Sequence, residues 1–186
     1  LQDLKTGQLV GRRNLTEGKT ANMCPAIDGA ISWNTGTYNP GTGLFYKIGQ
    51  EWCFDIEVVK ADRPADFSGQ AYFGASWTAT HPQGKKAYGH VTGRDPLSGK
   101  IKWRTEFKYP PLASLLSTKG NLVFVPGADG NFVALDARTG KEIWSHNNGI
   151  GHHGGVISYM AGGKQYVAVV TGWGSHVSGN YGPLFG

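Results

Sequence analysis

Two adjacent histidines, His152 and His153, are the first residues of this chain that could do chemistry. Imidazole is a common metal ligand, so the pair could form part of a metal site. Neighbouring residues of an extended chain point in opposite directions, however, and one ion cannot easily bind both rings. Glycines flank the pair, which favours a loop with ordinary hydrogen bonds. We expect His81 and His90 to be structural as well.

The two cysteines, Cys24 and Cys53, lack the closely spaced His or Cys neighbours of a zinc site. They could be two buried thiols, as in a cytosolic protein, or a disulfide, which needs an oxidising compartment. The residues alone slightly favour the disulfide and leave both alternatives open. Asp55 and Glu57 alternate along a predicted strand, and paired carboxylates on one face could act as a general acid and base.

The composition favours an all-β protein with many tight turns, because the chain of 186 residues holds 29 glycines and 9 prolines and lacks helical periodicity. The net charge of +5 is scattered, which argues against a nucleic-acid surface but is compatible with an acidic partner protein. No apolar run approaches the roughly 20 residues of a membrane span. The sequence begins at Leu1 inside a repeat, so we expect a cleaved or partial chain.

A repeated turn organises the chain that must position the candidate histidines, cysteines and carboxylates. Its elements are an Asp, a Gly and a closing Trp, and the two clear copies lie 41 positions apart: Asp95, Gly99 and Trp103, then Asp136, Gly140 and Trp144. Weaker copies begin at Asp3 and Asn39. The Asp can bind the backbone ahead of it, and the Gly can take a positive φ. A period near 40 residues with these features is typical of a four-stranded propeller blade.

The segments between the turns predict further strands. Two apolar runs, 44–48 and 52–58, are expected to pair as antiparallel neighbours. Residues 61–86 lack the repeat and are expected to form a loop insertion on one face. Residues 113–116 are small or apolar, which suits a crowded inner strand or the close approach of a flat ligand. The tail from residue 171 is expected to be a glycine-rich loop.

Five ordered segments resemble the quinoprotein alcohol dehydrogenases of the methanol/ethanol type, which are eight-bladed propellers that use pyrroloquinoline quinone (PQQ). The two clear repeats, followed by residues 163–169, are similar to that family's tryptophan-docking repeats. The other similar segments are 24–40, 52–55, 112–114 and 119–123. The resemblance covers essentially the whole chain and falls on the carboxy-terminal part of the family's catalytic propeller.

The resemblance implies an all-β fold, part of an eight-bladed β-propeller with four-stranded antiparallel blades. Residues 1–186 would make about four blades, and the remainder of the propeller would be absent from this chain. It also implies a disulfide between Cys24 and Cys53 and a periplasmic location. Trp103 and Trp144 would each dock one blade on the next, a structural role in which the indole buries a large area.

PQQ is a flat tricarboxylate with an ortho-quinone, and the family combines it with Ca²⁺ or a lanthanide and an aspartate base. The resemblance places the metal ligands and this aspartate before Leu1, so no catalytic or metal-binding residue is expected in this chain. It gives Asp55 and Glu57 no chemical role, and we expect both to be solvated or ion-paired.

Five residues are expected to form one side of the cofactor pocket. Ser32 falls where many family members carry an Asn that contacts the quinone, and Trp33 could edge the cofactor or belong to the core. Leu112 falls where methanol dehydrogenases carry a Trp, so with Ala113 it would form a roomier wall. Trp173 lies at the axial end of the last repeat and is a candidate cofactor or substrate contact.

The resemblance implies a section of a periplasmic dehydrogenase that oxidises alcohols to aldehydes or ketones, with PQQ as electron acceptor. Electrons would pass to a c-type cytochrome, and the sequence has no Cys-x-x-Cys-His segment that could attach a haem. The expected partners are the rest of the propeller, a small alcohol and this cytochrome, without nucleic acid. The alternative is a non-enzymatic propeller of PQQ-like repeats that acts as a protein-interaction scaffold.

Overall fold

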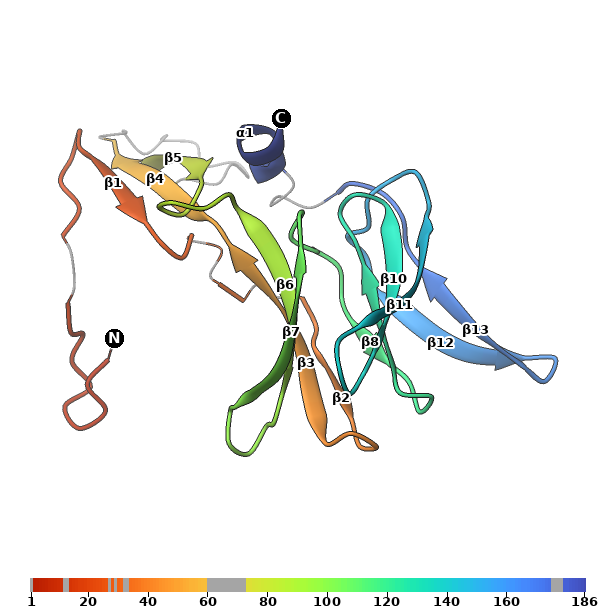
Figure 1. Ribbon diagram of the computed structural model, residues 1–186. Helices are drawn as coiled ribbons and strands as arrows, with labels where there is room; N and C mark the ends of the chain where they lie inside the picture. The colour runs from red at the N-terminus through yellow and green to blue at the C-terminus, as the bar shows by residue number, and fades with distance from the viewer. Residues whose placement is uncertain are drawn as a thin grey trace, which may run out of the picture.

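The computed structural model describes residues 2–11, 14–26, 28, 30–31, 34–59, 73–174 and 179–186. These residues form thirteen strands, grouped in four antiparallel sheets, and one short helix. Figure 1 shows two four-stranded sheets side by side at the centre, a two-stranded hairpin on one side and a three-stranded sheet on the other. Within the described ranges, no helix is long and apolar enough to cross a membrane.

The two central sheets are the first and second blades. The first blade contains, in spatial order, β2 (Thr37–Asn39), β3 (Leu44–Glu51), β6 (Tyr88–Arg94) and β7 (Ile101–Phe107). The second contains β8 (Leu116–Ser117), β9 (Leu122–Pro126), β10 (Asn131–Asp136) and β11 (Glu142–Asn147). Successive side chains of each strand point to opposite faces, so one face of the first blade can pack on the second.

The turn between the third and fourth strands has the same construction in both blades. In the second blade, Asp136 accepts hydrogen bonds from the amides of Arg138 and Thr139, each 2.9 Å long. In the first blade, Asp95 binds the amides two and three residues ahead at 2.9 and 3.2 Å, and these bonds hold its pKa below the usual value. The repeated sequence therefore makes a repeated turn.

A third unit begins with β12 (Val156–Ala161) and β13 (Lys164–Val169), which form the hairpin at one side of the molecule. Strands β2 and β12 both contact β8, so the first strands of the three units lie next to one another along one common line. Inner strands of a propeller converge in this way around its axis. We call this line the axis below.

The three-stranded sheet consists of β1 (Thr20–Met23), β4 (Cys53–Val58) and β5 (Ala75–Thr80), with β4 in the middle. The prediction that the runs 44–48 and 52–58 pair with each other is wrong, because β3 pairs with β2 and β6 whereas β4 pairs with β1 and β5. Only Trp52 separates β3 from β4, and one residue is too short for a hairpin turn.

The predicted loop insertion at 61–86 is not all loop. Its residues 60–72 lie outside the described residues, but β5 follows and pairs with β4 along its whole length. The tail also differs from the predicted glycine-rich loop, because residues 181–185 form a short helix, α1 (Tyr181–Phe185), which lies against β5 (Figure 1).

Two buried clusters hold these elements together. The first fills the interface between the blades with apolar side chains of both, among them Tyr46, Val91, Trp103, Val123 and Leu135. The second lies under α1 and joins it to the three-stranded sheet and to the second blade; its members include Trp52, Phe54, Leu112, Ala128 and Tyr181. Removing this apolar surface from water is the main stabilising contribution to the arrangement.

Candidate cofactor and substrate site

Trp103 docks the first blade on the second. It is 8% exposed, its indole N–H donates to the Ala137 carbonyl at 3.0 Å, and its ring stacks on Tyr46 with centroids 5.5 Å apart. The Tyr46 hydroxyl donates to the same carbonyl at 2.9 Å. A Cβ at Gly140 would lie 2.7 Å from Trp103 Cδ2, so only glycine leaves room for the indole. Trp103 is thus a structural residue, held by the main chain of the neighbouring blade.

Trp144 occupies the same position on β11 of the second blade but is 49% exposed. Its ring meets Phe132 edge-on, with centroids 6.2 Å apart, and stacks on His146. Both partners belong to its own blade. Within the described residues, the third unit consists of β12 and β13. These residues include no turn equivalent to the one at Gly140, on which the Trp144 indole could pack. The docking role of Trp144 therefore stays a prediction.

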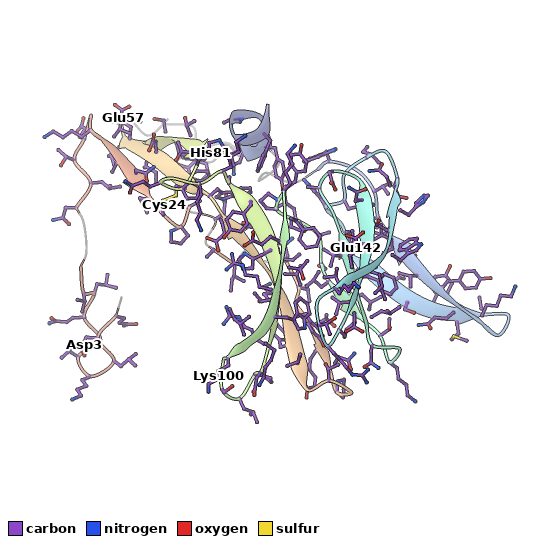
Figure 2. The ribbon with its side chains drawn as sticks, viewed as in Figure 1. Asp3, Cys24, Glu57, His81, Lys100 and Glu142 are labelled. Carbon is purple, nitrogen blue, oxygen red and sulfur yellow. A yellow bond between two sulfur atoms is a disulfide. The ribbon has the colours of Figure 1, made fainter. Side chains whose placement is uncertain are left out.

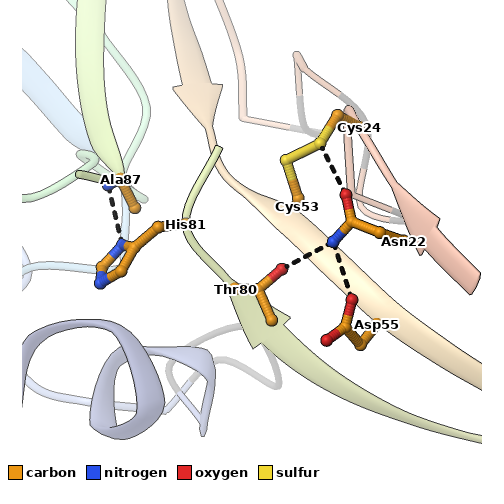
Figure 3. Close-up of a disulfide and its surroundings, with 7 residues drawn as sticks. All are labelled: Asn22, Cys24, Cys53, Asp55, Thr80, His81 and Ala87. Carbon is orange, nitrogen blue, oxygen red and sulfur yellow. Dashed lines mark hydrogen bonds between the residues drawn. A yellow bond between two sulfur atoms is a disulfide. The ribbon is translucent and has the colours of Figure 1, made fainter. Parts of the chain in front are cut away.

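A disulfide joins Cys24, which follows β1, to Cys53 at the start of β4 (Figure 3). Beside it, the Asn22 side-chain amide donates to Asp55 Oδ1 at 2.8 Å and to Thr80 Oγ1 at 3.1 Å. The disulfide is the one that the resemblance implied. Together with the amide it ties the three strands of this sheet into one unit.

Among the described residues, charged side chains meet around Arg104, which lies 3.1 Å from Glu51 and 3.8 Å from Glu106. Other charged side chains lie apart from one another: Figure 2 shows Asp3, Glu57 and Lys100 at separate edges of the molecule and Glu142 on the second blade. Among the described residues there is no group of three or more His, Cys, Asp or Glu side chains that could hold a metal ion.

The segment 112–115 lies at the axis, between the chains that lead into β2 and β12. The Leu112 carbonyl accepts a hydrogen bond from the Asn34 side-chain amide, and the Leu115 N–H donates to the Thr35 carbonyl at 3.1 Å. Leu112 and Ala113 are both buried. They belong to the packed interior beside the axis, and their contact with a cofactor stays a prediction.

Ser32 and Trp33, two further predicted contacts, lie outside the described residues. Close to them along the chain, the Gln50 N–H donates to the Ala30 carbonyl at 2.8 Å. The Gln50 side-chain amide and the Trp52 indole N–H are buried without a hydrogen-bond partner among the described residues. A buried polar group needs such a partner, from protein or from water, to offset its desolvation.

Trp173 is held in a fixed place with part of its ring free. It is 46% exposed, and its ring meets His153 at a centroid distance of 4.7 Å and Tyr181 at 5.4 Å, both edge-to-face. A Cβ at Gly151 would lie 2.7 Å from Trp173 Cε2, so the indole rests directly on this main chain. The Gly172 N–H donates to the Gly151 carbonyl at 2.8 Å, which fixes the approach of the tail.

The two adjacent histidines have separate structural environments. His152 is fully buried, with Nδ1 2.9 Å from the Gly127 carbonyl and Nε2 2.8 Å from the Asn148 side-chain amide. Because a carbonyl only accepts, Nδ1 carries a proton. Burial, and then the charge of the neighbouring His152, lower the pKa of His153, whose ring meets Trp173 edge-to-face. His152 makes the ordinary hydrogen bonds that the sequence predicted.

A pocket of about 310 Å³ opens beside Trp173. Three further aromatic side chains face it from two distant segments, together with small residues and one carboxylate; the lining is Tyr109, Ala128, Asp129, Trp173, Tyr181, Gly182, Phe185 and Gly186. Burial, and then the charge of Asp129, raise the pKa of Tyr181, so its hydroxyl stays protonated. That hydroxyl donates to the Pro110 carbonyl and fixes the ring.

Trp173 and the glycines beside it fit one wall for a flat cofactor ring. Trp173 offers a partly exposed ring on a glycine backbone, and Gly172, with a φ of 128°, leaves open space beside it. A positive charge also lies near the axis, since the Lys47 ammonium donates to the carbonyl of Asn34, whose side chain binds Leu112. The described residues do not fit a metal ion as a set of ligands.

Tyr109, Tyr181 and Phe185 escaped the sequence prediction. None of them belongs to the repeated turn, and Tyr181 reaches Pro110 across 71 positions of sequence. The spacing of four between Tyr181 and Phe185 was the one available signal, because it places both rings on one face of a helix.

Comparison with known proteins gives a consistent result. A family model described as "Glucose/ethanol/alcohol dehydrogenase, beta-propeller domain" matches residues 73–167, about half of the chain. The quinoprotein alcohol dehydrogenase PedH of Pseudomonas putida is 37% identical over 172 residues, which cover 91% of this chain and 27% of that protein. The 1-butanol dehydrogenase (cytochrome c) of Thauera butanivorans is 34% identical over 173 residues, 88% of this chain and 24% of that protein.

Solved structures agree with this comparison. A europium-containing methanol dehydrogenase superposes with a TM-score of 0.75 and 32% identity, over 83% of this chain and 27% of that chain. The similarity thus includes the three-dimensional arrangement of the blades. The chain spans about a quarter of the length of the proteins that it matches.

Proposed function

Because the chain belongs to the glucose/ethanol/alcohol dehydrogenase β-propeller family, we propose that the complete protein is a PQQ-dependent enzyme that oxidises alcohols to aldehydes or ketones. The observation that carries the proposal is the 37% identity, over 91% of this chain, to a quinoprotein alcohol dehydrogenase. The two antiparallel four-stranded blades and their tryptophan docking agree with it.

The role of this chain would be to bind and orient. PQQ, when bound, supplies a quinone that accepts the two electrons and two protons lost by the alcohol. Trp173 would form one wall for the flat ring, and Leu112 and Ala113 would hold the inner segments together near the axis. Because Gly151 and Tyr181 already fix Trp173, little side-chain freedom would be lost on binding.

The metal ion and the base would be contributed by other parts of the complete protein. We propose Ca²⁺ or a lanthanide as the ion, and the name of the europium-containing structural relative supports the second. The base would take the hydroxyl proton of the alcohol, as an aspartate suits. Neither is assigned to a residue of this chain.

A periplasmic location and a c-type cytochrome as electron acceptor are further parts of the proposal. The Cys24–Cys53 disulfide supports the location, since disulfides persist in oxidising compartments. The printed name of the Thauera relative includes cytochrome c, which supports the acceptor. A scaffold propeller without cofactor has less support, because the relatives above are named dehydrogenases.

Reconstitution tests the proposal. The full-length protein is supplied with PQQ and either Ca²⁺ or a lanthanide, and the reduction of an artificial dye is followed with ethanol as substrate. We expect dye reduction that requires protein, PQQ, metal and alcohol together. A protein that binds PQQ but reduces no dye with any of a series of alcohols would falsify the enzymatic function.

A further inference from the structure

A second pocket, of about 320 Å³, lies where the chain between β5 and β6 meets the end of β7 and α1. Its lining consists of four polar and three apolar side chains: His81, Lys86, Tyr88 and Lys108, then Ala87, Leu184 and Phe185. Among the described residues, Phe185 alone also lines the pocket beside Trp173. We call this second site the basic pocket. Its volume lies at the lower end of the range for small-molecule sites.

Every polar side chain of the basic pocket can donate a hydrogen bond. The Ala87 N–H donates to His81 Nδ1 at 3.0 Å, so this nitrogen is an acceptor and Nε2 carries a proton (Figure 3). The Tyr88 hydroxyl accepts from the Arg104 guanidinium at 2.8 Å, and its own hydrogen can still be donated. Two lysine ammonium groups complete the set. The described lining holds no carboxylate and no side-chain amide, so its polar chemistry suits an acceptor that carries negative charge.

The two lysines of the basic pocket have no carboxylate partner among the described residues. Neither Lys86 nor Lys108 forms an ion pair in this part of the chain, and the Lys108 ammonium lies 4.8 Å from the centre of the Tyr109 ring. Glu51 of the adjoining strand β3 is paired with Arg104 at 3.1 Å. An anion that entered the pocket would therefore meet two positive charges without displacing a carboxylate from them.

The rest of the lining is apolar. Ala87 and Leu184 are buried and form the floor of the basic pocket. Phe185 is half-buried, and its ring is held edge-on against Tyr109 with centroids 5.1 Å apart. An inorganic anion would leave this surface without a partner. An organic anion can bury an apolar body on it while its charge stays beside the ammonium groups.

We propose that the basic pocket binds a small organic carboxylate whose apolar body is about the size of a benzene ring. The carboxylate would accept hydrogen bonds from Lys86, Lys108 and the His81 Nε2–H, and the ring would lie against Leu184 and Phe185. Hydrogen bonds between charged groups are stronger than those between neutral ones, so the charge would supply the selectivity. The inference does not depend on the proposed function, because none of these residues has a part in the oxidation of the alcohol.

Fluorine NMR of a benzoate probe tests the basic pocket in the full-length protein. The probe is 4-fluorobenzoate, and 4-fluorobenzamide is the neutral control of nearly the same shape. We expect the carboxylate to bind about tenfold more tightly than the amide, because the amide lacks the charge. Unlabelled benzoate should displace the probe. Inorganic phosphate should displace it about tenfold less effectively, because phosphate has no apolar body to bury.

Three exposed lysines provide matched variants that each remove one positive charge. Lys86 and Lys108 line the basic pocket, whereas Lys100 lies between β6 and β7 at another edge of the molecule (Figure 2). We expect Lys86→Gln and Lys108→Gln each to weaken the binding of 4-fluorobenzoate about fivefold, the loss that follows from one charge contact in water. Lys100→Gln should leave the affinity within about twofold. Circular dichroism checks that all three variants are folded.

Each result decides the inference. Equal affinity for the carboxylate and the amide, or phosphate that competes as well as benzoate, would overturn the ligand class. Binding that is unchanged in both Lys86→Gln and Lys108→Gln, or that Lys100→Gln weakens equally, would overturn the site, as would a folded protein that binds no probe. The oxidation of ethanol is not measured in this experiment, so the proposed function stands or fails separately in the reconstitution assay.

Discussion

The docking turn of the second blade permits a sharp test of how the blades are joined. Gly140 has a φ of 73°, and a Cβ there would lie 2.7 Å from both Trp103 Cδ2 and Thr105 Oγ1. Gly99 holds the same position in the first blade with a φ of 69°, but a Cβ there meets nothing within 4 Å. The pair Gly140→Ala and Gly99→Ala therefore shares the backbone strain and differs in the contact with a docked tryptophan.

The two costs can be estimated separately. An alanine held at this positive φ loses about 1–2 kcal/mol relative to glycine, which applies to both variants. Forcing a methyl group against a packed ring adds about 1–3 kcal/mol, which applies to Gly140→Ala alone. We expect Gly99→Ala to lower the free energy of unfolding by about 1–2 kcal/mol and Gly140→Ala by about 2–5 kcal/mol.

Urea unfolding of the complete protein measures both variants. Tryptophan fluorescence should report the transition, since Trp103 is buried at the interface that Gly140→Ala disturbs. Equal losses of stability in the two variants would refute the reasoning, because strain alone would then account for both. A larger loss for Gly99→Ala would show that the first blade's turn has a partner beyond the described residues.

Three further predictions concern the disulfide and two buried polar side chains. Reduction of Cys24–Cys53, which closes 29 positions of sequence, should lower the free energy of unfolding by about 3–4 kcal/mol, and alkylation should require that reduction. Burial, and then the Arg104 charge, lower the pKa of His90 below its usual value of 6.5. The unfolded chain therefore binds a proton at His90 more readily than the folded protein, and the free energy of unfolding should fall as the pH drops below 6.5 toward the lower pKa. Urea midpoints measured between about pH 5 and 8 check this. Gln50→Met should raise the thermal unfolding temperature, with a gain of about 1 kcal/mol, because no unpaired amide is then buried.

Each of these predictions has an outcome that would contradict it. Alkylation of both cysteines without a reductant would show free thiols. A pH dependence that survives in His90→Gln, which cannot be protonated, would assign the effect to another group. A lower stability of Gln50→Met would show that water or a residue outside the described ranges already binds the amide.

The fold could be predicted from the sequence where local chemistry repeats. Asp136 and Gly140 form their turn from bonds within five residues, so the motif alone specifies it. The partner of β4 could not be predicted in this way. Apolar alternation shows that a strand has a buried face, but it carries no information about which sheet the strand joins after a one-residue break at Trp52.

The candidate site likewise has one part that the sequence indicates and another part that depends on long-range packing. Trp173 was predicted as a cofactor or substrate contact from its place at the end of a repeat. The structure puts it beside a pocket, and the contact itself stays a prediction. The rest of that pocket depends on the tail folding back against residues such as Tyr109, far away in the chain. Long-range packing of this kind follows from the whole fold. The spacing of four between Tyr181 and Phe185 indicates a shared helix face, but it does not indicate what that face packs against.

The docking of Trp103 has a consequence for how such proteins can change over time. The indole and Tyr46 bind a carbonyl of the neighbouring blade, at Ala137, and need one glycine there, Gly140. Every residue has a carbonyl, so the neighbour's other side chains in the turn are free to diverge without loss of this bond. A blade that keeps the turn and its glycine therefore still offers this carbonyl to the indole of its neighbour. Duplication of one blade would therefore carry this docking bond into both copies, while the residues of each copy at the axis could change independently.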